Sequence, residues 1–207
     1  MIKQERRKYR LTLTENLLGT IPTKKDLFTA HVASEETGED EPVKDLEGGE
    51  AGYTTFLQDA DGVYLFDYHV KGFLKEAGNV LKEQVETTKQ KKGGEPSERE
   101  AQTGVRALKS KLDNYVFVFP RRIFLKDKVD GVFERPLRAM TAMGPRVALA
   151  KSDFIAAGTQ FMVEIALLPH KELTWQMIEG LMDYGQLKGL GQFRNGSYGR
   201  FTWERVG

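Results

Sequence analysis

Apolar and polar residues alternate in two segments that lie near opposite ends of the chain. Residues 9–14 read Tyr-Arg-Leu-Thr-Leu-Thr, and residues 198–204 contain Tyr, Arg, Phe, Thr, Trp and Glu in this order, with Gly199 between the Tyr and the Arg. Alternation with a period of two over β-forming residues is typical of a strand that buries one face. We therefore expect a first strand at 9–14 and a last strand within 197–206.

Further strand-like segments lie between these two. Short apolar runs occupy residues 63–66, 115–120 and 123–125, and residues 131–142 predict an extended excursion. Two more runs, 146–150 and 159–168, are separated by a small-residue turn that contains Ala156, Ala157 and Gly158. A short link of this kind between two strand-like runs predicts a hairpin.

Apolar residues return at helical spacing in two places. The first stripe predicts a helix from near Val70 to residue 82, with Asp67 as its cap, and consists of Phe73, Leu74, Ala77, Val80 and Leu81. The second predicted helix, 175–187, follows Thr174, which is a favourable N-cap residue. Its expected buried face consists of Met177, Ile178, Leu181 and Met182.

The principal elements follow the order strand, helix, two strands, helix, strand. This order predicts an α+β fold class, with a ferredoxin-like (RRM-like) βαββαβ core that carries insertions and forms one domain over residues 1–207. Such a core covers one sheet face with helices and leaves the other free. RNA-recognition modules of this topology bind single strands there, although ferredoxin-like domains also have many other functions.

Two polar segments interrupt the predicted core. An acidic insertion covers about 35–52, where eight carboxylates are opposed only by Lys44, and a second segment covers about 89–104 and contains Gly-Gly and Pro96. Segments with so few apolar residues do not bury enough surface to form a packed structure. We expect both to be flexible insertions between core elements.

The net charge of +1 hides a difference between the two halves of the chain. The first 104 residues contain 15 Lys and Arg against 20 Asp and Glu, and the remaining residues contain 16 against 10. A basic surface attracts polyanions, so the C-terminal half is the expected place for a nucleic-acid contact.

Several classes of site and location are disfavoured by composition. The chain has no cysteine, and its histidines, His31, His69 and His170, lack the spacing of metal ligands, so we expect no metal and no cofactor. Neither a long uncharged apolar run nor a signal-peptide pattern is present. We therefore expect a cytoplasmic protein with no membrane partner.

A glycine-rich loop precedes the last predicted strand and contains the strongest candidates for binding. Glycine allows positive φ and a close approach of backbone N–H groups, while arginine provides forked donors that suit phosphate. A plain glycine-rich loop with solvated arginines is the structural alternative. The candidate RNA-binding residues are Gly189, Gly191, Arg194, Asn195, Gly196, Ser197, Tyr198, Gly199 and Arg200.

Three lysines extend this candidate set. Lys71 lies at the amino end of the first predicted helix, where an ammonium and helix N–H groups can meet one phosphate. Lys24 and Lys25 lie in the loop after the first strand and are candidates for additional contacts to the RNA backbone. A solvent-exposed lysine is the structural alternative for each.

Three segments together resemble the RAMP superfamily, the repeat-associated mysterious proteins of CRISPR systems. Residues 69–75, His-Val-Lys-Gly-Phe-Leu-Lys, are similar to the Ser-Leu-Lys-Gly-x-x-Arg start of the family's first helix. Residues 154–165 are similar to its Pro-Ala-Gly-Thr-x-Phe hairpin, with Ala156 in place of the proline, and residues 189–201 are similar to its glycine-rich loop.

The resemblance implies a CRISPR-associated, RRM-like subunit that binds guide or other single-stranded RNA in antiviral defence, with the glycine-rich loop against the RNA. It further implies other CRISPR-type subunits, or copies of the same chain, as partners. Within the superfamily, this description applies to the non-catalytic backbone subunits of effector complexes. A diverged relative carried by a phage would show the same three segments.

Two alternatives remain open. Some RAMP proteins cleave RNA without metal through a histidine that activates a 2′-hydroxyl, and His31 and His69 are the candidates for that role here. A lone histidine is more often structural, so binding is favoured over catalysis. The other alternative is a structural or decoy protein, for example from a phage, in which the acidic insertion mimics nucleic acid.

Overall fold

A computed structural model describes residues 3–22, 53–86, 105, 107–141 and 144–206. The helices are α2 (Asp67–Glu86), α3 (Leu108–Tyr115) and α4 (Trp175–Asp183), with 3-10 turns η1 (Tyr184–Gln186) and η2 (Arg194–Gly196). The strands are β1 (Glu5–Leu13), β2 (Leu17–Leu18), β3 (Ile21–Pro22), β4 (Tyr53–Thr55), β5 (Leu57–Asp59), β6 (Gly62–Phe66), β7 (Val116–Phe119), β8 (Arg122–Lys126), β9 (Gly131–Thr141), β10 (Gly144–Ile155), β11 (Gln160–Leu167) and β12 (Phe201–Arg205).

The central sheet has the strand order β12-β1-β11-β7, and all of its neighbouring strands are antiparallel. Helix α2 lies in the sequence between β1 and β7, and α4 lies between β11 and β12. This is the ferredoxin-like arrangement, in which the two central strands are the first and third of the βαββαβ order. The predicted α+β, ferredoxin-like fold class with insertions is confirmed.

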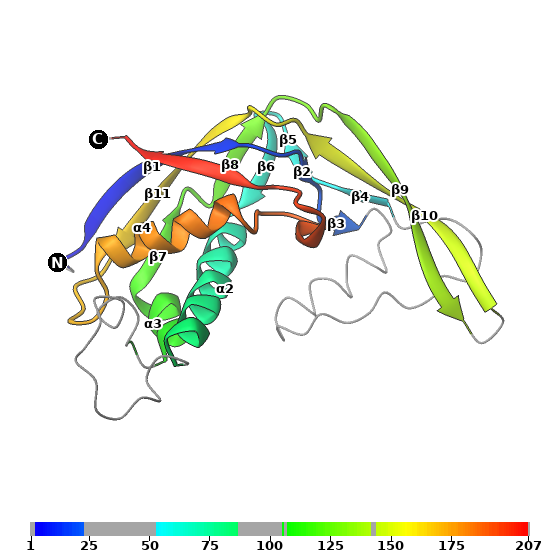
Figure 1. Ribbon diagram of the computed structural model, residues 1–207. Helices are drawn as coiled ribbons and strands as arrows, with labels where there is room; N and C mark the ends of the chain where they lie inside the picture. The colour runs from blue at the N-terminus through cyan, green and yellow to red at the C-terminus, as the bar shows by residue number, and fades with distance from the viewer. Residues whose placement is uncertain (1–2, 23–52, 87–104, 106, 142–143, 207) are drawn as a thin grey trace.

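The helices pack against one face of this sheet (Figure 1). Alternation along β1 directs Tyr9, Leu11 and Leu13 into the core, where they are almost fully buried. The matching side of α4 contributes Ile178 and Leu181, which are also fully buried. The period-two pattern of β1 and the helical pattern of α4 therefore meet in one apolar layer.

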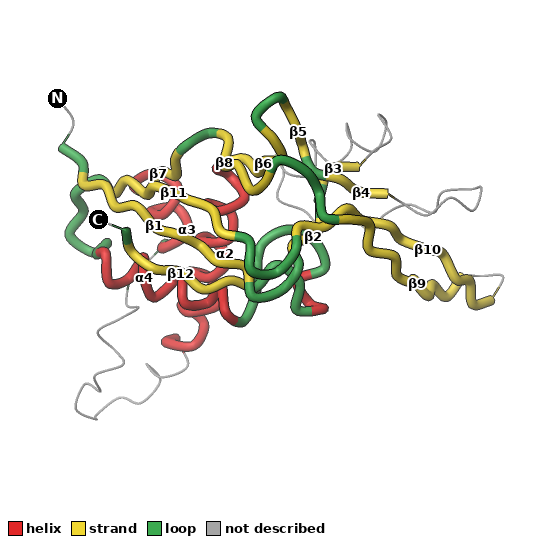
Figure 2. Tube along the Cα trace, turned by 90° about the horizontal axis from the view of Figure 1, so that it is seen from above, coloured by secondary structure: helices red, strands yellow, loops and turns green. Residues whose placement is uncertain are grey.

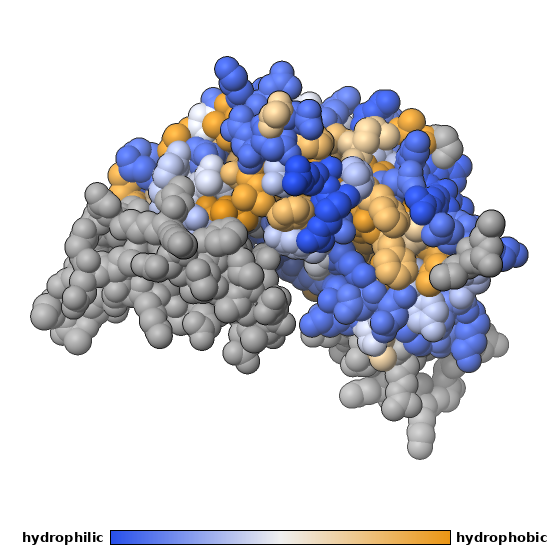
Figure 3. Space-filling model, turned by 180° about the vertical axis from the view of Figure 1, so that it is seen from behind, coloured by the Kyte–Doolittle hydropathy of each residue, from blue (hydrophilic) through white to orange (hydrophobic). Residues whose placement is uncertain are grey.

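The opposite face of the central sheet is not covered by α2, α3 or α4 (Figure 2). Two of its cations are neutralised within the sheet, because Arg6 pairs with Glu164 and Arg10 pairs with Glu204, each at 2.7 Å. Its exposed aromatic residues, Phe117 and Phe119, lie on the edge strand β7. Seen from behind the view of Figure 1, the surface of the molecule has apolar patches among hydrophilic side chains (Figure 3).

Two smaller sheets adjoin the core. In one, β10 pairs with β2, β4 and β9, and in the other β6 lies between β5 and β8. The hairpin formed by β9 and β10 extends away from the central sheet (Figures 1 and 2). The extended excursion was expected at residues 131–142, and its residues Gly131–Thr141 form the long strand β9 of this arm.

The prediction that residues 146–150 and 159–168 form a hairpin is wrong. Strand β10 pairs with β9 in one sheet, whereas β11 pairs with β1 and β7 in another. The turn between them bends toward β1, since the Gly158 N–H donates to the Leu13 carbonyl at 2.7 Å and the Leu13 N–H donates to the Thr159 carbonyl at 2.9 Å. The small residues thus connect two sheets.

Other boundaries also differ from the sequence pattern. Helix α2 begins at Asp67, earlier than expected, and the Asp67 carboxylate accepts the N–H of Tyr68. Helix α3 was not predicted.

The predicted cap of α4 is confirmed, since the Thr174 hydroxyl accepts the Met177 N–H at 3.3 Å. The helix was expected to reach residue 187, but α4 ends at Asp183 and is followed by the 3-10 turn η1. The insertions expected at about 35–52 and 89–104 lie outside the described residues.

Candidate nucleic-acid interface

The glycine-rich loop, residues 189–199, joins η1 to β12 and is bonded to the bend between β1 and β2 and to β2 itself. The Gly199 N–H donates to the Asn16 carbonyl at 2.8 Å, and the Gln192 N–H donates to the Leu18 carbonyl at 3.3 Å. The loop is closed on itself by a bond from the Leu190 N–H to the Gly199 carbonyl at 2.9 Å. Its backbone is therefore fixed relative to the end of the central sheet.

Close backbone packing explains why the loop contains glycine at several positions. A Cβ on Gly199 would overlap the Leu190 carbonyl oxygen, and one on Gly189 would overlap the backbone of Gly199. A Cβ on Gly191, whose φ is +75°, would lie 2.6 Å from the Leu18 carbonyl oxygen. These three glycines are required by contacts within the protein, whatever the loop binds.

The tip of the loop is the turn η2, which is flanked by two non-glycine residues in left-handed conformation. Phe193 has φ of 55° and Ser197 has φ of 73°. Such conformations cost roughly 1 to 3 kcal/mol and persist only where surrounding contacts hold them. Here the Gly196 N–H donates to the Phe193 carbonyl, and Gly196 lies so close to the Phe193 ring that a Cβ would overlap it.

Arg194 is directed toward helix α2. Its Nη1 donates to Glu76 Oε2, and both side chains are about one-third exposed. Lys188 lies 3.7 Å from the other Glu76 oxygen and donates to Asn195 Oδ1 at 2.8 Å. One carboxylate therefore contacts two cations on the same side of the molecule, and Asn195 is drawn into the same group.

Arg200 and Tyr198 have different surroundings. The Arg200 Nε donates to the Leu187 carbonyl at 3.0 Å, which leaves its other guanidinium donors without a bond to a described residue. The Tyr198 ring lies between two aromatic neighbours, stacked on Phe193 at 5.6 Å and tilted against Phe133 at 4.9 Å. Tyr198 thus belongs to a small aromatic cluster between the loop and strand β9.

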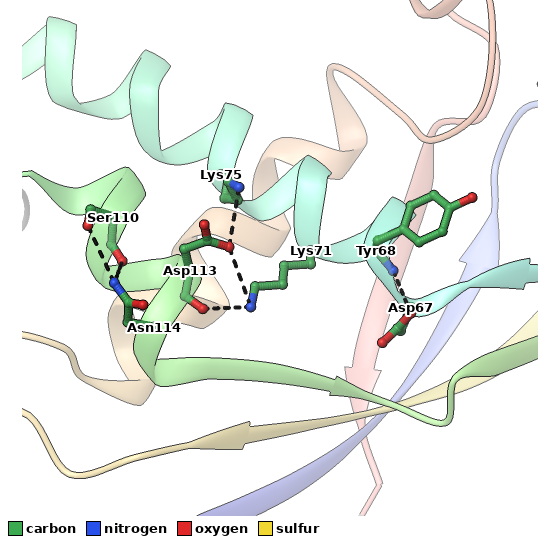
Figure 4. Close-up of polar contacts among 7 residues, drawn as sticks. All are labelled: Asp67, Tyr68, Lys71, Lys75, Ser110, Asp113 and Asn114. Carbon is green, nitrogen blue, oxygen red and sulfur yellow. Dashed lines mark hydrogen bonds and ion pairs between the residues drawn. The ribbon is translucent and has the colours of Figure 1, made fainter. Parts of the chain in front are cut away.

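Lys71 lies on a different side of α2 from Glu76. Its Nζ donates to the Asp113 carbonyl at 2.7 Å and lies 3.6 Å from the Asp113 carboxylate, which Lys75 also contacts at 3.3 Å (Figure 4). Burial raises the pKa of Asp113, but the hydrogen bond and charge of Lys75, followed by those of Lys71, outweigh it and lower the net pKa. The ammonium of Lys71 also lies 5.0 Å from the centre of the Phe117 ring.

His69 is held against the body of the protein at the start of α2. Its Nδ1 lies 3.2 Å from the Phe66 carbonyl oxygen, its Nε2 lies 3.4 Å from the Thr20 hydroxyl, and its ring stacks on Tyr68 at 4.5 Å. His31, Lys24 and Lys25 lie outside the described residues. The structure thus brings the loop residues together but does not bring Lys71 or His69 to them.

Strand β9 supplies two residues that the sequence pattern did not identify. Phe133 and Arg135 lie two positions apart on one side of β9, and both contact the loop: Phe133 meets Tyr198, and the Arg135 guanidinium lies 3.7 Å from the centre of the Phe193 ring. Burial lowers the pKa of Arg135 from its usual value. No local signal marks these residues, because their importance arises from a tertiary contact.

The three segments that resemble the RAMP superfamily meet in space. Asn16 connects two of them, since its side-chain oxygen accepts the Ala157 N–H at 3.0 Å and its carbonyl accepts the Gly199 N–H. The third segment joins through Phe73 of α2, whose ring meets that of Phe201 at 5.2 Å. Segments that are far apart in sequence therefore converge at the end of β1.

The similarities of this chain to known proteins are to solved structures. No protein-family model matches the sequence, and no curated protein matches it. Among solved structures, the chain is similar to a chain in a cryo-EM structure of the type III-B Cmr-beta bound to cognate target RNA, with a TM-score of 0.49 and 12% sequence identity. The similarity covers 99% of this chain and 61% of that chain. Because this TM-score is below 0.5, the assignment of the fold depends on the strand order of the central sheet and not on this similarity.

The described residues contain no group of three or more His, Asp and Glu side chains arranged to hold a metal ion. No helix in the described part of the chain is long and apolar enough to cross a membrane.

Proposed function

We propose that this chain is a non-catalytic, single-stranded RNA-binding subunit of the RAMP type, with the glycine-rich loop as part of its RNA contact. The observation that carries the proposal is the convergence of the three RAMP-like segments at Asn16 and Phe201. Residues separated by more than a hundred positions resemble one family and also form one local structure. A chance resemblance of short motifs would not require them to meet.

The chemistry of the loop suits the phosphate backbone of RNA. Arg200 retains guanidinium donors that make no bond to a described residue, and Arg194 is paired only at a partly exposed site. Exposed ion pairs contribute little free energy, typically about 0 to 1 kcal/mol, so a phosphate can compete with Glu76 for Arg194. Contacts of this kind position a strand without reading its sequence.

A guide RNA is the specific ligand that we propose, with other CRISPR-type subunits or copies of this chain as further partners. Lys71, Asn195, Ser197 and Tyr198 remain candidates for secondary contacts. In the free protein Lys71 is bonded to Asp113, so RNA must displace or share that contact.

A salt titration of RNA affinity tests this function. Each phosphate neutralised on a single strand contributes about 0.7 to the slope of log affinity against log salt, so Arg194→Ala with Arg200→Ala should flatten the slope by about 1.4. Sequence preference should change little. The matched control is Arg121→Ala with Arg122→Ala, which removes two exposed, carboxylate-paired arginines near and on β8. The absence of RNA affinity in the wild type at low salt would refute the proposal.

A further inference from the structure

Arg135 differs from most other arginines of the described chain in having no carboxylate partner. Arg6, Arg7, Arg10, Arg121, Arg122 and Arg194 each lie within ion-pair distance of an Asp or Glu. Arg135 makes no ion pair and no hydrogen bond with any described residue, and its Nε is buried without a partner. Leaving a buried donor unpaired is costly, so such a group requires an explanation.

The carboxylate nearest to Arg135 in sequence is directed elsewhere. Glu134 pairs with Lys151 at 2.6 Å on the other side of the hairpin arm, as the alternation of side chains along a strand requires. Arg135 instead faces the loop together with Phe133. The strand therefore keeps its acidic group away from this guanidinium.

The ring beneath Arg135 is held rigidly. Phe193 is fixed by its left-handed backbone, by the Gly196 backbone against its edge and by the Tyr198 ring stacked at 5.6 Å. Phe133 in turn supports Tyr198. Despite these contacts, 37% of Phe193 remains exposed, although it is a large apolar residue at the tip of a loop.

We infer that Arg135 and Phe193 form a binding site for one nucleotide of a single-stranded RNA. The guanidinium provides forked donors for the phosphate. Arg135 covers one face of the Phe193 ring and the offset Tyr198 ring covers part of it as well, so the base stacks on the part of the ring that remains exposed. An aromatic ring that holds a guanidinium leaves its N–H groups free to bind a ligand at the edge. The inference rests on the proposed function and adds a specific site, between the loop and the base of the β9–β10 hairpin.

The position of the site also defines a path for the strand. Arg194 and Phe193 are adjacent, but Arg194 is directed to α2 and Phe193 to β9. A strand that contacts both must cross the loop tip from the helix layer toward the hairpin arm. Phosphate contact at Arg194 and nucleotide binding at Arg135 are thus separate contacts that can be removed independently.

The test measures binding of a uridine oligoribonucleotide and of an abasic ribose-phosphate oligomer of the same length. Arg135→Gln should weaken binding of both and flatten the salt slope by about 0.7. Phe193→Leu should weaken binding of the uridine oligomer about tenfold, because stacking contributes about 1 to 3 kcal/mol per base, but should leave binding of the abasic oligomer unchanged. Arg122→Gln, at a carboxylate-paired arginine, is the matched control.

Photo-crosslinking of 4-thiouridine RNA to the wild-type chain gives a second test that does not depend on the folding of a variant. Crosslinks should map to the peptides that carry Phe193 or residues 133–135. If the wild type binds RNA and Arg194→Ala with Arg200→Ala flattens the slope, but Arg135→Gln and Phe193→Leu behave as the wild type, this inference fails while the proposed function stands. Competition by poly-glutamate as strong as by RNA, and independent of Phe193, would indicate an acidic protein partner and overturn the nucleotide site.

Discussion

The guanidinium of Arg194 in the glycine-rich loop is bonded to the carboxylate of Glu76 on helix α2, 118 residues away in the sequence. Lys188 approaches the same carboxylate, so Glu76 offsets two positive charges next to the loop. A phosphate that binds Arg194 must therefore compete with a carboxylate of the same chain. The proposed RNA contact therefore predicts that Glu76 weakens RNA binding while it contributes to the stability of the fold.

Replacing Glu76 should strengthen RNA binding. Glu76→Gln removes the competing charge and frees Arg194, so we expect the affinity for single-stranded RNA at low salt to rise several-fold. The free energy of unfolding should fall by no more than about 1 kcal/mol, because the pair is partly exposed. Filter binding and urea denaturation measure the two effects. Asp59→Asn, which frees Arg122 on β8, is the control, and a loss of RNA affinity in Glu76→Gln would count against the loop as the contact.

The close contact at Gly199 should be important for stability. Gly199 and Gly158 both have positive φ, at 71° and 85°, but a Cβ on Gly158 would meet no atom within 4 Å. Gly158→Ala should therefore cost only the left-handed backbone, about 1 to 2 kcal/mol, whereas Gly199→Ala should cost at least about 2 kcal/mol more. Urea denaturation of both variants measures the difference, and equal costs would show that the loop relaxes around the new methyl group.

Alkaline pH should weaken the contact between Tyr53 and Asp153. The Tyr53 hydroxyl donates to the buried Asp153 carboxylate at 2.6 Å, and this hydrogen bond, together with burial, raises the pKa of Tyr53 to about 12. Because the pKa of Tyr53 is higher in the folded protein than its unfolded value of 10.0, the contribution of this hydroxyl to stability is complete below pH 10. That contribution is lost as the pH rises through about 12.

Tyr53→Phe isolates that contribution. At neutral pH the variant should be less stable by about 1.5 to 3 kcal/mol, the usual contribution of a hydrogen bond to a charged group. The difference between wild type and variant should shrink between pH 10 and 12, while the alkaline loss due to Tyr9, whose pKa burial also raises, is common to both. A difference that stays constant up to pH 12 would contradict the role of this hydroxyl.

The chain should bind RNA without cleaving it. His69 is engaged by the Phe66 carbonyl, the Thr20 hydroxyl and the Tyr68 ring. We expect end-labelled RNA to remain intact with the wild type and with His69→Ala, in the presence of EDTA. Cleavage by the wild type that disappears in His69→Ala or His31→Ala would instead support a metal-independent nuclease.

Local patterns predicted those parts of the fold that are determined locally. The alternation around Tyr9 and the N-cap at Thr174 depend on neighbouring residues, and both are confirmed. Helix α3 escaped prediction because it is short and buries only Leu108 and Leu112, which is too few residues for a clear period. The hairpin prediction failed because strand runs linked by a short turn look the same whether they pair together or enter two sheets.

In the candidate site, too, the sequence predicted what depends on local geometry and missed what depends on tertiary contacts. Glycine spacing identified the loop, because Gly189 and Gly199 satisfy backbone contacts within the loop and Gly191 has a positive φ, although the backbone that Gly191 approaches, at Leu18, is far away in the sequence. The partners of its cations are tertiary, so the sequence alone showed neither that Glu76 neutralises Arg194 nor that Arg135 lacks a partner.

Strand β1 lies between β11 and β12, both of which are made after residue 159. During synthesis on the ribosome, the apolar side of β1 therefore emerges long before either neighbour exists. Unpaired strands with exposed apolar side chains are prone to aggregate, so the nascent chain should depend on chaperones until Phe201–Arg205 has left the exit tunnel. The ferredoxin-like sheet of this protein is thus completed only once its last strand, β12, has emerged.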